Sequence, residues 1–142
     1  MASEADHIAC ANRTQKTISH LLQDIATHSP WLAITAFYKA IHIVEAVFAN
    51  NRKIGHASTH DEREKFLKDD RRYEKIYRHY SPLKRAALNA RYLTDCTVFD
   101  NYLSPQEVVE KLLKHELHQV EESAAKFLKQ PEKLERISTL FK

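Results

Sequence analysis

A histidine and an arginine near an expected helix start have the residue types and the spacing to bind a phosphate group. Thr59 and Glu62 form the pattern of a capping box, which predicts that a helix begins at the next residue, His60. Arg63 lies one turn later, so both side chains can point toward an anion near the exposed N–H groups, with His56 in the preceding loop. A simpler interpretation stays open, in which the acidic residues of this turn stabilise the helix N-terminus and Arg63 forms a surface ion pair.

A second candidate site is a polar stripe on the apolar helix expected over residues 30–48. Tyr38, His42 and Glu45 are spaced i, i+4 and i+7, which places them on one face of that helix. The stripe either lines a polar cleft, where it could bind a nucleotide, or faces solvent together with Thr35 and Lys39. The sequence leaves both interpretations open.

The segment from Tyr80 to Tyr92 offers a third group of polar and aromatic side chains. Arg91 and Tyr92 are candidates for nucleotide binding, and Tyr92 shares a helix face with Arg85 and Asn89. The alternative is that Tyr80 and Tyr92 are core aromatic residues whose hydroxyl groups are hydrogen-bonded.

The histidine and acidic residues do not have a recognised metal-binding spacing. Four of them could offer ligands: His42, Glu45, His56 and His60. A di-metal bundle site, however, needs paired helices with Glu-x-x-His motifs. His115 and His118 are three residues apart, which differs from the H-E-x-x-H pattern of zinc proteases. The sequence also lacks a glycine-rich phosphate loop. These motifs therefore predict neither a bound metal ion nor another cofactor.

These candidate residues must be positioned by helices, because helix-start signals recur along the chain. Three serine–proline pairs place a hydroxyl at the N-cap and a proline at the first helical position, beginning at Ser29, Ser81 and Ser104. Thr59 is a fourth start, and the apolar residues between these caps recur at helical spacing. The pattern predicts an all-α fold, an up-and-down helical bundle of four to five helices.

Length and composition agree with one helical domain over residues 1–142. Gly55 is the only glycine, and all-β folds need glycine repeatedly in turns and bulges. The connections are predicted to be short except over 50–58 and 97–103. A last segment with Leu134, Ile137 and Phe141 is expected to pack on the bundle or on a second subunit.

The sequence favours the cytoplasm. Cys10 and Cys96 are too few for a disulfide framework, and no signal-peptide pattern precedes the first expected helix. The most apolar stretch, over residues 31–48, is interrupted by Lys39, His42 and Glu45. Since each charge would have to be desolvated in a bilayer, this stretch is predicted to be a buried bundle helix and not a membrane span.

Three segments between residues 30 and 95 resemble small prokaryotic HEPN-domain proteins: AITAFYKAIHIVEAVFA, HASTHDEREKFL and YRHYSPLKRAALNARYL. In that family, a helix with a tyrosine-rich start is followed by a histidine loop and a later arginine–tyrosine helix. The resemblance implies a bundle of four or five helices that commonly pairs into a homodimer.

The same resemblance implies two functions. Some HEPN proteins are metal-independent endoribonucleases of toxin–antitoxin or defence systems and carry an Arg-x4–6-His motif. Others bind RNA, nucleotides or a nucleotidyltransferase partner without catalysis. Two stretches have the nuclease spacing, Arg72 to His79 and Arg13 to His20. In the first, Tyr73 stands where the motif usually has a polar residue.

The prediction is therefore an RNA- or nucleotide-binding domain in which either of two pairs could catalyse cleavage, His60 with Arg63 or His79 with Arg72. The alternative is a non-catalytic interaction module that binds a nucleotidyltransferase or another protein. A general acid or base and a cation beside the phosphate are the only groups that such metal-independent cleavage needs.

Overall fold

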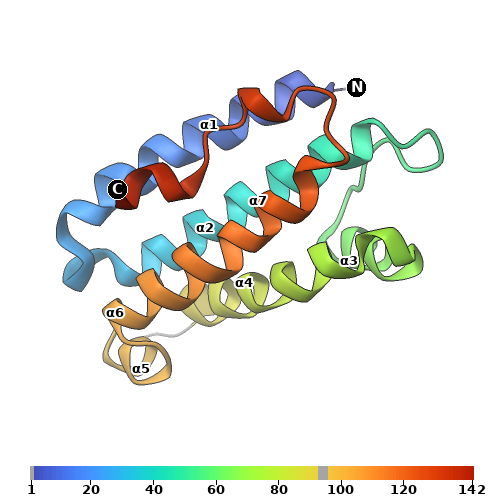
Figure 1. The fold of residues 1–142 in the computed structure, drawn as a ribbon. Helices are drawn as coiled ribbons and strands as arrows, with labels where there is room; N and C mark the ends of the chain where they lie inside the picture. The colour runs from blue at the N-terminus through green and yellow to red at the C-terminus, as the bar shows by residue number, and fades with distance from the viewer. Residues whose placement is uncertain (1, 93–95) are drawn as a thin grey trace.

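The computed structural model describes residues 2–92 and 96–142, and within these residues the chain is all-α, with no strand. Four long helical segments lie side by side (Figure 1). They are α1 (Glu4–Leu21), α2 (Ile25–Ala49), α4 (Glu74–Tyr92), and a continuous segment made of α6 (Pro105–Glu107), η3 (Val108–Leu117) and α7 (His118–Ala125). The predicted helical bundle is confirmed.

Shorter elements join and cover these helices. Two short α-helices, α3 (His60–Asp69) and α5 (Cys96–Tyr102), flank α4 in the chain. Short 3-10 helices lie at η1 (Leu22–Asp24), η2 (Arg71–Tyr73), η4 (Pro131–Lys133) and η5 (Ile137–Phe141), whereas η3 has the wider π-helical turn. The predicted loop over 97–103 is therefore wrong, because α5 covers most of it.

The second long helix lies at the centre of the bundle. α2 packs against α1, α4 and η3, and most of its residues are buried. Such a helix is apolar nearly all round because each face meets another element. Its most apolar part is long enough to cross a membrane by length and composition alone, but 78% of that stretch is buried inside the bundle. The position of this stretch in the core of the bundle thus explains why it is so apolar.

Two of the predicted helix starts are confirmed. The Thr59 hydroxyl accepts a hydrogen bond from the Glu62 N–H at 3.0 Å, and the Glu62 carboxylate accepts one from the Ser58 N–H. Ser104 and Glu107 form a complete capping box at the start of α6. The predicted loop after α2 is also present, and its Gly55 has a φ of 67°, a value that favours glycine.

The predicted start at Ser29 is wrong. The helix begins at Ile25, where Asp24 caps the N–H of Thr27 at 3.2 Å, so Pro30 lies inside the helix. The carbonyl that Pro30 leaves without its usual donor belongs to Ala26, which is exposed to solvent. Ser29 is instead buried, and its hydroxyl bonds Asp100 of α5 at 3.2 Å.

The predicted start at Ser81 is also wrong, because α4 continues through Ser81 and Pro82. A proline inside a helix costs about 3 kcal/mol. The buried stripe of α4 runs through this point, with Tyr80 before the proline and Leu83 after it. We infer that packing of this stripe on α2 outweighs the missing hydrogen bond.

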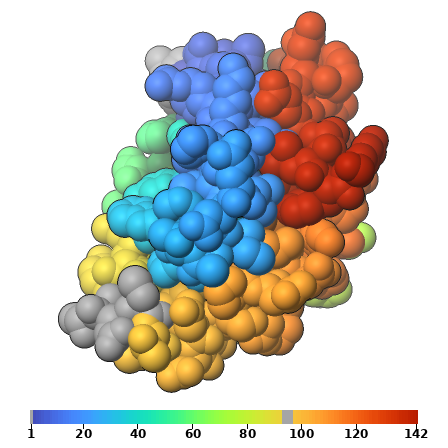
Figure 2. Space-filling view, turned by 90° about the vertical axis from the view of Figure 1, so that its left-hand side faces the viewer, coloured from blue at the N-terminus to red at the C-terminus, as the bar shows by residue number. Residues whose placement is uncertain are grey.

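The C-terminal segment returns along α1 and packs on the same chain (Figure 1). Figure 2 shows it on the surface beside α1. Leu134 and Ile137 are buried and Phe141 is partly buried, so the segment packs on the bundle, one of its two predicted positions. The Asn12 side chain donates to the Lys133 carbonyl at 3.0 Å and the Gln15 side chain donates to the Arg136 carbonyl at 2.8 Å.

A buried lysine fixes this segment to the bundle. The Lys39 ammonium, which is 0% exposed, donates to Gln15 at 2.6 Å, to Glu121 at 2.6 Å and to the Glu135 carbonyl at 2.7 Å. The Glu121 carboxylate also accepts a hydrogen bond from the Ile137 N–H at 3.0 Å. All three donors of the ammonium are therefore satisfied. The interpretation that placed Lys39 on a solvent-exposed face is wrong.

Candidate functional site

A buried carboxylate organises the candidate site. Glu45 comes from the central helix α2 and its side chain is almost wholly buried. One of its oxygens accepts a hydrogen bond from the Ala57 N–H at 3.1 Å and contacts His56 Nδ1 at 2.9 Å. The other accepts one from Arg63 Nε at 2.9 Å. Glu45 thus links α2 to the histidine loop and to the first turn of α3.

The arginine of the predicted phosphate pair is buried in this network. Arg63 is 7% exposed, so the expected surface ion pair is wrong and its partner is the buried Glu45. Its Nη1 lies 3.1 Å from Nδ1 of His60, which confirms that the two predicted residues meet. A guanidinium can only donate, so Nδ1 of His60 must accept and the proton of the neutral ring lies on Nε2. His60 is therefore held as a hydrogen-bond donor at its other nitrogen.

The surroundings keep His60 neutral. Burial lowers the pKa of His60 below its ordinary value, and the positive charges of Arg63, Lys84 and Arg91 lower the pKa further against the charge of Asp61. Lys84 also forms an ion pair with Glu64 at 3.0 Å. Arg63 is likewise paired with Glu45, so the charges of Arg63 and Lys84 are partly balanced by their own carboxylate partners.

Aromatic side chains pack against the His60 ring and against one another. The ring of Phe37 lies 5.5 Å from the ring of His60 and 5.3 Å from that of Tyr80. Tyr80 is fully buried, which raises the pKa of its hydroxyl to about 12. Tyr80 is thus a core residue, as one of the two interpretations expected. Its hydroxyl, however, has no hydrogen-bond partner among the described residues, although Arg63 is close enough to influence its pKa.

The predicted stripe on α2 runs from the surface into the core. Tyr38 is exposed, His42 is half-buried and Glu45 is buried. Tyr38 and His42 line a groove of about 350 Å³ together with Arg13 of α1. Burial lowers the pKa of His42, and the nearby His7 and Arg63 lower it further. The stripe therefore faces a groove at one end and the Glu45 network at the other.

The two other nucleotide-binding candidates lie at the end of α4. Tyr92 is 70% exposed, so the prediction that it is a core aromatic is wrong. The guanidinium of Arg91 lies 5.4 Å from the centre of its ring. An exposed tyrosine with an arginine over it presents flat surfaces on which a nucleobase can stack.

The second predicted catalytic pair, Arg72 and His79, makes no direct contact within the part of the chain that the structure describes. Arg72 pairs with the Asp70 carboxylate at 2.7 Å and lines a groove of about 730 Å³ that also holds Arg52 and Arg71. His79 instead bonds the Glu116 carboxylate at 2.9 Å, on η3. Each side chain thus has its own carboxylate partner.

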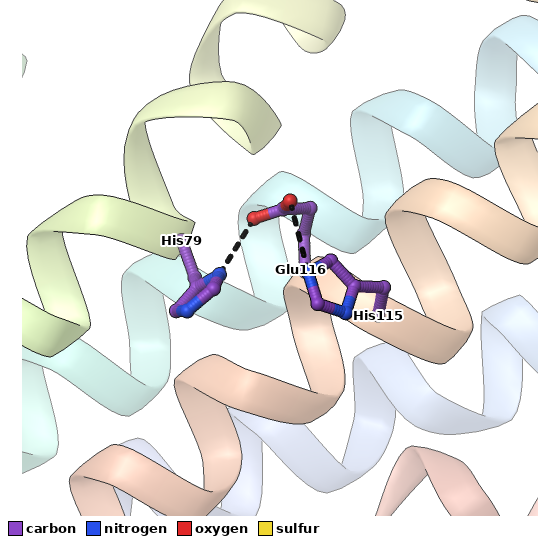
Figure 3. A group of neighbouring side chains, drawn as sticks. All are labelled: His79, His115 and Glu116. Carbon is purple, nitrogen blue, oxygen red and sulfur yellow. Dashed lines mark hydrogen bonds and ion pairs between the residues drawn. The ribbon is translucent and has the colours of Figure 1, made fainter.

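The sequence analysis missed the grouping of His79 with His115 and Glu116. Figure 3 shows these side chains between α4 and η3. The two histidines are far apart in the sequence, so no local spacing could reveal them. Only the packing of α4 against η3 brings the three residues together.

Comparisons with protein-family models, with curated proteins and with solved structures find no match for this chain. Function is therefore inferred from the side chains of the site and from the chemistry they allow.

Proposed function

We propose that this chain is a HEPN-like domain that binds RNA or nucleotides through a phosphate group at His60. The observation that carries the proposal is the bond between Arg63 Nη1 and His60 Nδ1 at 3.1 Å. Because Glu45 holds Arg63 in place, the imidazole of His60 has a fixed tautomer and a fixed orientation. Its Nε2–H can donate to a phosphate oxygen without first losing or gaining a proton.

The neighbouring side chains suit a nucleic-acid ligand. Arg91 and Lys84 supply positive charge near His60, as their effect on the pKa of His60 indicates. The exposed ring of Tyr92 is adjacent to Arg91 and can stack on an unpaired base. Single-stranded RNA combines both features, a charged backbone and bases that are free to stack.

The tautomer of His60 favours binding over cleavage at this position. A general base would need a lone pair on Nε2, but the bond from Arg63 to Nδ1 puts the proton there. Arg63 would have to release His60 before this histidine could accept a proton from a ribose hydroxyl. Of the two activities implied by the resemblance, the cluster supports recognition of phosphate more than metal-independent ribonuclease chemistry.

The second candidate function is that of an interaction module for a nucleotidyltransferase or another protein. The observation that favours it is the exposure of large apolar side chains near the start of α2 and on α5. Trp31 is 60% exposed, and Val98 and Tyr102 are also exposed. Tryptophan and tyrosine are enriched among residues that dominate protein interfaces.

We also propose that the protein forms a homodimer, as the HEPN resemblance implies. The C-terminal segment is no longer available as the contact face, since Leu134 and Ile137 are buried against their own bundle. We expect light scattering at micromolar concentration to give the mass of two chains, about twice 16.6 kDa. A mass of one chain would contradict this proposal.

RNA binding by a site variant and by a matched control variant tests the proposed function. Fluorescence anisotropy of a labelled single-stranded RNA, in EDTA and at low salt, gives the affinity. His60→Ala should weaken binding about tenfold or more, because a hydrogen bond to a charged group contributes about 1.5–3 kcal/mol. His115→Ala removes an exposed histidine of η3, outside the candidate RNA-binding residues, and should bind like the parent. Equal affinity of both variants would exclude His60 as a phosphate-binding residue.

A further inference from the structure

We propose that His79, His115 and Glu116 form a binding site for one divalent transition metal ion of the zinc type, between α4 and η3. Each residue offers one ligand atom, and these atoms all lie within 4.8 Å of one another. Figure 3 shows the Glu116 carboxylate directed toward the His79 ring, with the His115 ring beside it. The site is separate from the His60 cluster and does not depend on RNA binding.

The carboxylate lies between the two imidazole rings. One oxygen of Glu116 is 2.9 Å from Nδ1 of His79, and the other is 3.6 Å from Nε2 of His115. The two rings are nearly perpendicular, with their centres 5.4 Å apart. Two imidazole nitrogens and one carboxylate oxygen therefore lie close together, and they come from two different helical elements.

This donor set matches known metal chemistry. Two histidines and one carboxylate are the protein ligands of several catalytic zinc sites and of non-haem iron sites, and they leave positions open for water. Tetrahedral bonds of about 2.1 Å place neighbouring ligand atoms about 3.4 Å apart. The three ligand atoms lie within 4.8 Å of one another, so a ligand atom that lies beyond this spacing must move inward when the metal binds.

The side chains differ in freedom in a way that allows this movement. His79 and Glu116 are mostly buried between the helices, so their positions are fixed by packing. The side chain of His115 is 59% exposed, so it can change rotamer without disturbing the core. Water can reach the open positions of the metal from the same side.

The nearest lysines of η3 do not form ion pairs with the Glu116 carboxylate. The two lysines of η3 nearest in sequence have partners of their own, Lys111 with Glu107 at 2.7 Å and Lys114 with Glu110 at 3.0 Å. Glu116 is thus left to the two histidines among the ion pairs of the described residues. A metal would take the place of the hydrogen bond between His79 Nδ1 and the Glu116 carboxylate, and the proton of the neutral His79 ring would then lie on Nε2.

The backbone of η3 is a second unusual feature of the site. Its ten residues, Val108–Leu117, form a π-helix, and His115 and Glu116 lie in its last part. π-helical turns are rare and occur frequently at functional sites. This π-helix carries His115 and Glu116, the two proposed ligands that come from η3.

Cobalt(II) titration of the tag-free protein tests the proposal. We expect one equivalent of cobalt to bind, to produce the visible absorption of a nitrogen- and oxygen-ligated ion, and to be displaced by zinc. His115→Ala should weaken binding at least about tenfold, because even the loss of a residue that only supports a ligand weakens metal affinity 10- to 100-fold. His20→Ala is the matched control, since it also removes an exposed histidine and should bind as the parent does.

Thermal unfolding gives a second measurement on the same variants. Zinc should raise the Tm of the parent and of His20→Ala, because it binds the folded state and joins α4 to η3. At the same zinc concentration it should raise the Tm of His115→Ala by less, because binding is weaker. Circular dichroism of this variant without metal checks that it folds like the parent. Absence of saturable cobalt binding to the parent, or equal affinity of His115→Ala, would overturn the proposal and leave an ion pair that only joins the two helices.

Discussion

Replacement of Lys39 by methionine should lower the free energy of unfolding by about 3–5 kcal/mol, the usual result when one partner of a buried ion pair is removed. Both Lys39 and Glu121 have 0% exposed side chains. Burial lowers the pKa of Lys39 and raises that of Glu121, and their mutual attraction opposes both shifts. Without Lys39, the Glu121 carboxylate would keep only its bonds from the Ile137 N–H.

Chemical denaturation of three variants checks this prediction. Lys39→Met combined with Glu121→Gln should recover much of the loss, because the amide is uncharged and its oxygen can still accept from Ile137. Lys111→Met is the matched surface control, and its i,i+4 pair with Glu107 should be worth about 0.5 kcal/mol or less. If Lys39→Met is no more destabilising than Lys111→Met, the buried ion pair is not an anchor of the C-terminal segment.

Arg63→Met should also lower the free energy of unfolding by about 3 kcal/mol or more. The substitution leaves the buried Glu45 with the Ala57 N–H and the half-exposed His56 as its remaining partners. His60→Ala, one turn earlier, should cost only about 1 kcal/mol or less, because it leaves the Glu45–Arg63 bond intact. The two residues of the predicted phosphate pair therefore differ strongly in their structural importance.

A double-mutant cycle separates the ion pair from other effects of the substitution. Glu45→Gln, Arg63→Met and the double variant are unfolded by urea together with the parent. We expect a coupling free energy of about 1–3 kcal/mol, since the two side chains share a buried network. Additive changes would show that Arg63 and Glu45 do not stabilise each other.

Signals that act within a few residues predicted two of the four expected helix starts. The Thr59 and Ser104 caps are confirmed because a cap needs only a hydroxyl and an N–H three residues later. Ser29 and Ser81 carry the same signal, yet helices pass through both positions. An upstream cap at Asp24 and the continuous buried stripe of α4 decide those boundaries, and a serine–proline pair contains no information about either.

The ion-pair partners of the buried charged residues could not be predicted from the sequence. Lys39 was compatible with a solvent-exposed face because its acceptors come from α1, α7 and the C-terminal segment. Proximity of His60 to Arg63 followed from their spacing on one helix, but the partnership of Arg63 with Glu45 depends on how α3 packs on α2. Local spacing therefore identified the candidate pair and could not identify the residue that holds it.

The salt dependence of RNA binding tests the proposed function most directly. Affinities of the parent, His60→Ala and Arg91→Ala for a single-stranded RNA are measured in EDTA at several salt concentrations. Because His60 is a neutral donor, His60→Ala should weaken binding about tenfold and leave the slope of log K against log salt unchanged. Arg91→Ala should reduce that slope by about 0.7, the value for one phosphate contact on a single strand. An unchanged affinity of His60→Ala, or no binding by the parent at low salt, would contradict the proposed phosphate site.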